Sequence, residues 1–146
     1  MKPLKLITAI LLAAATIGCQ SKKAGNIPVV GFVDAFEDAT IAQARTGFTD
    51  ALKKNGFNEA DGTVKIAYRN AQGDIPTLTQ IVNYFTAEKV DLFATCTTLS
   101  TITAVQKNKI TPIFAMVAPT AALMKVTDAA GKGPANLYGA VEDMNY

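Results

Sequence analysis

The chain has 146 residues, with 14 Lys and Arg against 12 Asp and Glu, and it contains neither His nor Trp. This length suits one domain with a substantial core, and the near-balanced charge argues against a nucleic-acid partner, which needs a basic stripe. The absence of His excludes Ser-His and Cys-His catalysis and the commonest zinc sites, so we expect no enzymatic activity, metal or other cofactor.

The first residues are typical of a bacterial lipoprotein signal peptide. Lys2 and Lys5 accompany an apolar run at residues 6–17, which is too short to span a bilayer as a helix. Gly18 stands directly before Cys19, the residue that would carry the lipid after cleavage. The alternative is an ordinary secretory signal that leaves Cys19 unmodified. Both interpretations predict an extracytoplasmic protein, and the first attaches it to the membrane, in the periplasm or at the cell surface, by a lipid anchor only.

The sequence therefore divides into a predicted signal peptide at residues 1–18, a polar tether at residues 19–27 and a folded domain at residues 28–146. Without Lys2 and Lys5, 12 basic side chains balance 12 acidic ones. If Cys19 is lipidated, Cys96 has no disulfide partner, because the chain contains no third cysteine. Cys96 is then expected to form a small apolar wall inside the domain.

Apolar runs alternate with amphipathic stretches along this domain. The apolar runs predict strands at residues 28–33, 63–68, 90–95, 111–117 and 137–141. The amphipathic stretches predict helices at residues 38–55, from about 74 to beyond 85, at 99–107 and at 119–128. This alternation predicts an α/β fold: a parallel sheet of about five strands in the order 2-1-3-4-5, with helices on both faces.

Ligands of such sheets bind at the loops that follow the carboxyl ends of the strands. Phe36 follows the first strand, where it would stack on an aromatic or apolar ligand or only pack at the edge of the core. Thr97 and Thr98 begin the helix after the third strand. Their hydroxyls and the free N–H groups there would bind a carboxylate, or the threonines only cap the helix.

Three further loops contribute candidate side chains. Asp34 would accept a ligand ammonium group or serve as an ordinary loop residue, and Asn70 and Gln72 would hydrogen-bond a polar ligand or only order their own turn. Pro119 follows the fourth strand. Because the strands run side by side, we expect one concavity lined by Phe36, Gln72, Thr97, Thr98 and Pro119.

Several segments together carry a family resemblance, and the run Asn70-Ala71-Gln72-Gly73-Asp74 is the most specific of them. The others are residues 47–57, residues 90–95 with the Thr-rich loop that follows, residues 111–114 and residues 136–139. In order and spacing these segments are similar to a group of bacterial ABC-transporter substrate-binding lipoproteins, which includes binders of tryptophan and other aromatic amino acids. The chain departs from that pattern at Ala118, where the family usually has Asp, and at residues 34–38.

The resemblance implies a type I periplasmic binding protein fold, of which this chain would be the N-terminal lobe only. It also implies the function: the extracytoplasmic solute-binding component of an ABC importer, binding a small organic solute such as an amino acid. The partners would be that solute and an ABC permease in the membrane. Two alternatives are a single-domain sensory or interaction module and a truncated, non-functional fragment.

Overall fold

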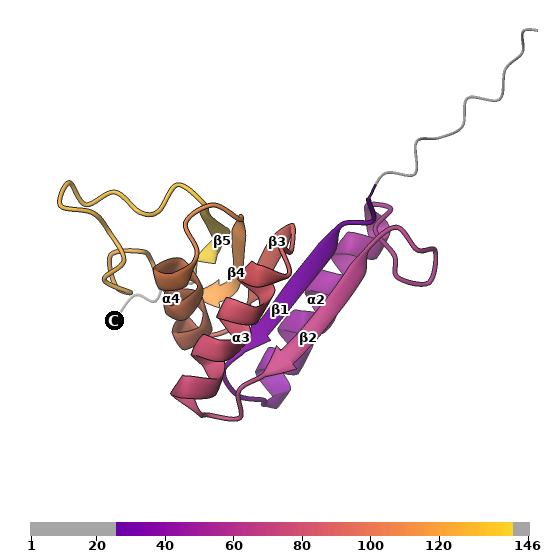
Figure 1. The fold of residues 1–146 in the computed structure, drawn as a ribbon, viewed down its shortest axis with the longest axis horizontal. Helices are drawn as coiled ribbons and strands as arrows, with labels where there is room; N and C mark the ends of the chain where they lie inside the picture. The colour runs from indigo at the N-terminus through magenta and orange to yellow at the C-terminus, as the bar shows by residue number, and fades with distance from the viewer. Residues whose placement is uncertain (1–25, 142–146) are drawn as a thin grey trace, which may run out of the picture.

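The computed structural model describes residues 26–141 (Figure 1). The predicted signal peptide, the predicted lipidation site Cys19 and most of the predicted tether lie outside this range, as do residues 142–146. Among the described helices, none has both the length and the hydropathy that crossing a membrane requires.

Five parallel strands form one sheet in the order β2-β1-β3-β4-β5. The strands are β1 (Val29–Asp34), β2 (Lys65–Asn70), β3 (Leu92–Thr95), β4 (Ile113–Ala118) and β5 (Leu137–Val141), and the helices are α2 (Ala39–Lys54), α3 (Ile75–Ala87) and α4 (Thr98–Lys107). The predicted α/β fold and strand order are therefore confirmed. The first four strands begin one or two residues later than predicted.

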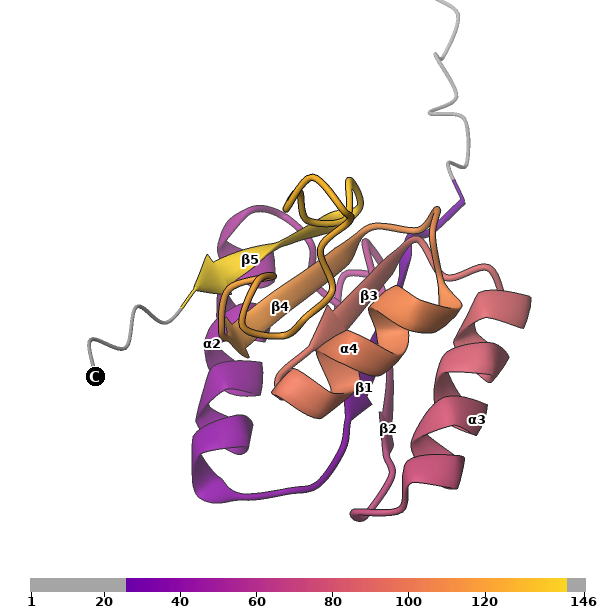
Figure 2. The same ribbon diagram turned by 90° about the vertical axis from the view of Figure 1, so that its left-hand side faces the viewer.

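The helices lie on both faces of the sheet, as predicted (Figure 2). Val30 and Phe32 of β1 pack with α2 on one face, where Phe32 and Phe48 meet edge to face with their ring centroids 5.9 Å apart. Val33 points to the other face and packs with α3 and α4. At Gly31 the chain needs a residue without a side chain, since a Cβ there would lie 3.0 Å from the Phe85 ring of α3. The alternation along β1 thus fixes which helix covers which face.

The helix predicted at residues 119–128 does not form, and that prediction was wrong. The segment makes a single turn, in which the Met124 N–H donates to the Thr120 carbonyl at 3.0 Å. Lys125 then adopts the left-handed conformation with φ 55°, which ends the turn. A single turn orders several residues for few hydrogen bonds, so it does not by itself nucleate a longer helix. The crossover from β4 to β5 is therefore irregular.

Candidate functional site

A hollow of about 230 Å³ opens where β1, β3 and β4 end and where α2 and α4 begin. We call it the strand-end hollow. Its lining is Phe36, Asp38, Thr40, Ile41, Cys96, Thr97, Thr98 and Val117. Three of the predicted site residues, Phe36, Thr97 and Thr98, therefore meet in one concavity, although they come from different loops. This is the outcome expected for parallel strands whose carboxyl ends share one edge of the sheet.

Thr97 and Thr98 have different surroundings at the start of α4. Thr97 is buried and is the N-cap: its hydroxyl accepts from the Ser100 N–H at 3.1 Å, and the Ser100 hydroxyl accepts from the Thr97 N–H at 3.2 Å. Thr98 is exposed, and its hydroxyl makes no hydrogen bond within residues 26–141. The first N–H groups of a helix also lack intrahelical acceptors. Thr98 is therefore the member of this pair that is open to a ligand.

An aromatic ring and a buried thiol supply apolar surface to the hollow. Phe36 is 45% exposed, so its ring is available to a ligand rather than used in the core. Cys96 is buried, and burial raises the pKa of its thiol to about 11, which keeps the sulfur protonated and neutral. This agrees with the expectation that Cys96 forms a small apolar wall.

Asp34, the last residue of β1, does not line the strand-end hollow and is not open to a ligand. Its side chain is fully buried, and Oδ2 accepts from Arg45 Nη1 at 3.0 Å. Burial raises the pKa of Asp34 to about 6 despite the neighbouring Arg45 guanidinium. Asp38, which the sequence analysis did not single out, is exposed and lines the hollow. Its Oδ1 caps α2 by accepting from the Ile41 N–H at 2.8 Å, while Oδ2 makes no hydrogen bond within residues 26–141.

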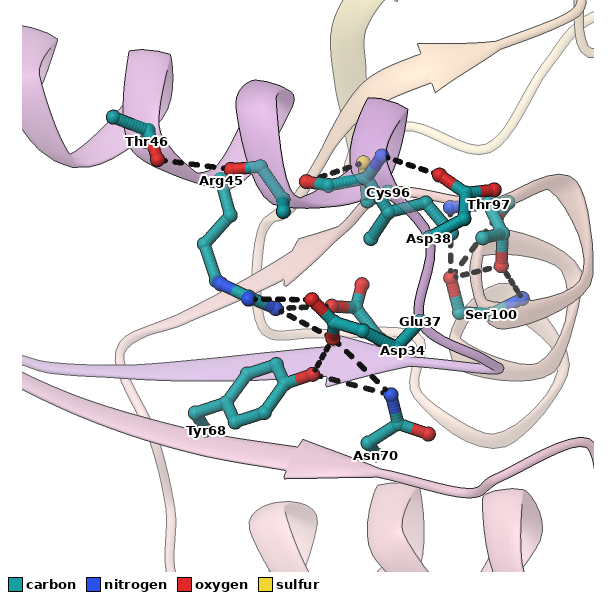
Figure 3. A network of polar contacts seen from close by, with 12 residues as sticks. Asp34, Glu37, Asp38, Arg45, Thr46, Tyr68, Asn70, Cys96, Thr97 and Ser100 are labelled. Atoms are coloured by element: carbon teal, nitrogen blue, oxygen red, sulfur yellow. Dashed lines mark hydrogen bonds and ion pairs between the residues drawn. The ribbon is translucent and has the colours of Figure 1, made fainter.

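Beside the hollow, polar side chains from β1, β2, α2 and the loop between β1 and α2 form one connected group (Figure 3). Arg45 binds Glu37 through two nitrogen–oxygen contacts of 2.8 and 3.1 Å, and the Tyr68 hydroxyl donates to the same carboxylate. Asn70 Nδ2 is 3.1 Å from the Tyr68 hydroxyl. With Asp34 these residues form the Arg45 network. Hydrogen bonds from Arg45 and Tyr68 lower the pKa of Glu37 to about 2, so Glu37 stays charged.

The sequence analysis did not identify Glu37, Arg45 or Tyr68. A signal for Arg45 was present, because it lies one turn after Ile41 on the face of α2 that is otherwise apolar. A cation there needs a buried carboxylate partner, and Asp34 is the partner that the fold provides.

The remaining predicted residues lie outside the strand-end hollow. Asn70 orders its own turn, because Oδ1 accepts from the Gln72 N–H at 2.6 Å. Gln72 is exposed with φ 52° and does not line the hollow. Pro119 lines a separate hollow of about 300 Å³ together with Met124 and Tyr138. The structure thus brings only part of the predicted set around one concavity.

The model of the ABC transporter substrate binding protein family matches residues 26–145. A curated tyrosine-binding protein from Clostridioides difficile (strain R20291) is 35% identical over 94 residues, which cover 64% of this chain and 26% of that protein. Among solved structures, the ligand-free, open form of a Clostridium difficile substrate-binding protein with adhesive properties has a TM-score of 0.71 and 28% identity over 80% of this chain.

Two further solved structures show the same fold. One is a conserved domain protein from Vibrio cholerae, with a TM-score of 0.72 and 23% identity, and the other is an ABC domain from Streptococcus pneumonia in complex with L-Trp, with 0.71 and 18%. Each covers 80% of this chain, which spans 39% of each of the solved chains and 26% of the curated relative. Because the family model covers more than half of its residues, the chain belongs to the ABC transporter substrate binding protein family.

Proposed function

We propose that this chain supplies one lobe of the extracytoplasmic solute-binding component of an ABC importer, and that the solute is a small amino acid-like molecule. Family membership supports a substrate-binding role, and the curated relative is a tyrosine-binding protein. No catalytic step belongs to this proposal. The observation that carries it is that an exposed aromatic ring, a free carboxylate oxygen and an open helix N-terminus line one hollow.

Each part of an amino acid has a counterpart in the strand-end hollow. The N-terminus of α4 offers N–H groups and the Thr98 hydroxyl to a carboxylate, and the helix dipole favours negative charge there. Asp38 offers its second oxygen to an ammonium group, a role that buried Asp34 does not fill in this conformation. Phe36 presents its ring to an apolar or aromatic side chain. Together these residues distinguish a zwitterion with an apolar group from a simple anion.

In the proposed mechanism, two lobes close around the solute and deliver it to a permease in the membrane. Closure of two lobes about a hinge removes water from both faces of the ligand, which strengthens its polar contacts. A hollow on a single lobe contacts only one side of a ligand. We therefore expect tight binding only in a protein that carries both lobes.

The test is calorimetric titration of a two-lobed protein with L-tyrosine and L-tryptophan, before and after Thr98→Val. A hydrogen bond to a charged group is worth about 1.5–3 kcal/mol, so the substitution is expected to weaken binding about tenfold or more. Thr103→Val is the matched control, because the Thr103 hydroxyl donates to the Leu99 carbonyl within the same helix and does not line the hollow. Equal affinity of the Thr98 variant and the parent would contradict a role for Thr98.

A further inference from the structure

The Arg45 network encloses the loop that carries Phe36. Arg45 Nη1 contacts Asp34 at the first end of the loop, and both guanidinium nitrogens contact Glu37 near its other end. One planar group from α2 thus bridges two carboxylates that flank Phe36 in the sequence. A bidentate contact of this kind fixes direction as well as distance, because the guanidinium and carboxylate planes must align.

Contacts from β2 hold the same loop from the other side. Arg45 lies over the Tyr68 ring, with its guanidinium carbon 4.3 Å from the ring centroid, while the Tyr68 hydroxyl donates to Glu37. The backbone carbonyl of Ala35 accepts from the Gly73 N–H at 2.8 Å, and Ala35 is buried. Asp38 caps α2. Asp34, Glu37 and Asp38 are thus held by polar side-chain contacts, and Ala35 is held by burial. The Phe36 side chain is held by none of these, and it lines the strand-end hollow.

Stability alone gives a poor account of this arrangement. The pair between Arg45 and the fully buried Asp34 contributes little to stability, because desolvation of the charges opposes their attraction. The second partner, Glu37, is 45% exposed, and exposed ion pairs contribute little as well. Here one buried oxygen, Asp34 Oδ1, has no hydrogen-bond partner within residues 26–141. An apolar pair would cover β1 without that penalty. What the charged groups provide, and an apolar pair would not, is a fixed orientation of the loop beside the hollow.

We propose that Arg45 is a positioning residue, which holds residues 35–38 so that the Phe36 ring is presented to the strand-end hollow before a ligand arrives. Arg45 does not line the hollow itself and acts through Asp34 and Glu37. The effect of Arg45 on ligand affinity rests on the proposed function, whereas its effect on the order of residues 35–38 does not. A preordered ring spares the ligand the free energy of ordering the loop on binding.

The first experiment measures the order of the loop without ligand. Because the chain contains no Trp, Phe36→Trp introduces a single indole reporter at the position in question. Time-resolved anisotropy of that reporter is then compared in the parent, in Arg45→Met and in Arg69→Met. Arg69 is the matched control: its guanidinium carbon lies 4.4 Å from the Tyr84 ring centroid, as Arg45 lies over Tyr68, but no ion pair to a carboxylate is found for Arg69 within residues 26–141.

We expect the amplitude of the fast local decay to rise about twofold or more in Arg45→Met and to stay unchanged in Arg69→Met. An identical decay in the parent and in Arg45→Met would overturn the proposal, as would an indole that is already mobile in the parent. Arg45→Met could fail to fold because Asp34 loses its partner. In that case the double variant Asp34→Asn/Arg45→Met, which removes both charges, replaces it. A fast anisotropy decay in the double variant identical to that of the parent would then overturn the proposal.

The second experiment measures the affinity for L-tyrosine by calorimetry in a two-lobed protein that carries this lobe, with the native Phe36 in place. Arg45→Met is expected to weaken binding about tenfold, and Arg69→Met by less than about twofold, because only the first releases the loop. A parent that binds no L-tyrosine would count against the proposed solute and leave the anisotropy result to decide on Arg45. If the parent binds L-tyrosine and both variants bind it with the affinity of the parent, Arg45 does not contribute to ligand binding, and that part of the proposal is overturned.

Discussion

Asp34 is the residue whose environment departs furthest from that of an ordinary carboxylate. It is fully buried, it has one ion-pair partner, and its pKa is raised to about 6 because burial outweighs the attraction of Arg45. The folded protein therefore holds the Asp34 proton more tightly than the unfolded chain does. Between pH 4 and pH 6 the folded state binds more protons at this site, so the Asp34 contribution to the free energy of unfolding falls as pH rises.

Asp34→Asn is expected to remove this decline. In urea titrations from about pH 4.5 to pH 7.5, the parent should lose on the order of 2 kcal/mol from Asp34, and the variant should show a flatter profile. The lower limit of this range lies at the upper edge of the region, from about pH 4.5 down to about pH 2, in which Glu37, with its pKa lowered to about 2, loses its own stabilising contribution as pH falls. Asp50→Asn, an exposed carboxylate on α2, is the control and should keep the parental slope. A parental slope in Asp34→Asn would refute this account.

At the level of the helix, the neighbours Thr97 and Thr98 separate stability from binding. Thr97 makes the reciprocal contacts with Ser100 that cap α4, whereas Thr98 makes no side-chain hydrogen bond within residues 26–141. Thr97→Ala is therefore expected to lower the free energy of unfolding by about 0.5–2 kcal/mol, the usual range for a lost N-cap. Thr98→Ala should change it by less than about 0.5 kcal/mol. Denaturant unfolding of both variants checks the pair, and equal losses would show that the capping assignment is mistaken.

The sequence predicted most helices and strands but only part of the candidate site. Apolar runs such as residues 28–33 identify buried strands because helices cover both faces of a parallel sheet, and the alternation with helices restricts the topology. At residues 119–128 the predicted helix was wrong, since one favourable turn resembles the start of a helix.

The Arg45 network escaped prediction for a different reason. Its members come from β1, β2, α2 and the loop between β1 and α2, and they meet only because the register pairs Phe32 with Tyr68 and Asp34 with Asn70. A shift of that register by one residue would turn Tyr68 to the opposite face of the sheet. The strand-end hollow was predictable in part, because the rule for parallel sheets gives the edge where loops gather but not which side chains turn into it.

For the whole molecule, the sequence predicts attachment to the membrane through a lipid on Cys19. The predicted lipidation site Cys19 lies ahead of the described residues, in a segment where Gly18 precedes it. We predict that metabolic labelling with palmitate in the bacterial host marks the parent protein and fails on Cys19→Ala. Cys96→Ala serves as the control, because the buried Cys96 thiol is not open to an acyl donor. Equal labelling of the parent and Cys19→Ala would refute the lipoprotein signal.

The strand order also sets the sequence in which the sheet can assemble during synthesis. β1 emerges first and lies between β2 and β3 in the finished sheet, so an interior strand is made before either of its neighbours (Figure 2). Each later strand is then added at an edge of the sheet: β2 pairs with one side of β1, and β3, β4 and β5 follow in turn on the other side. Parallel pairing requires a long crossover, which makes each addition slower than closing a hairpin. The β2-β1-β3 part of the sheet therefore consists entirely of residues that are synthesised before β4 and β5.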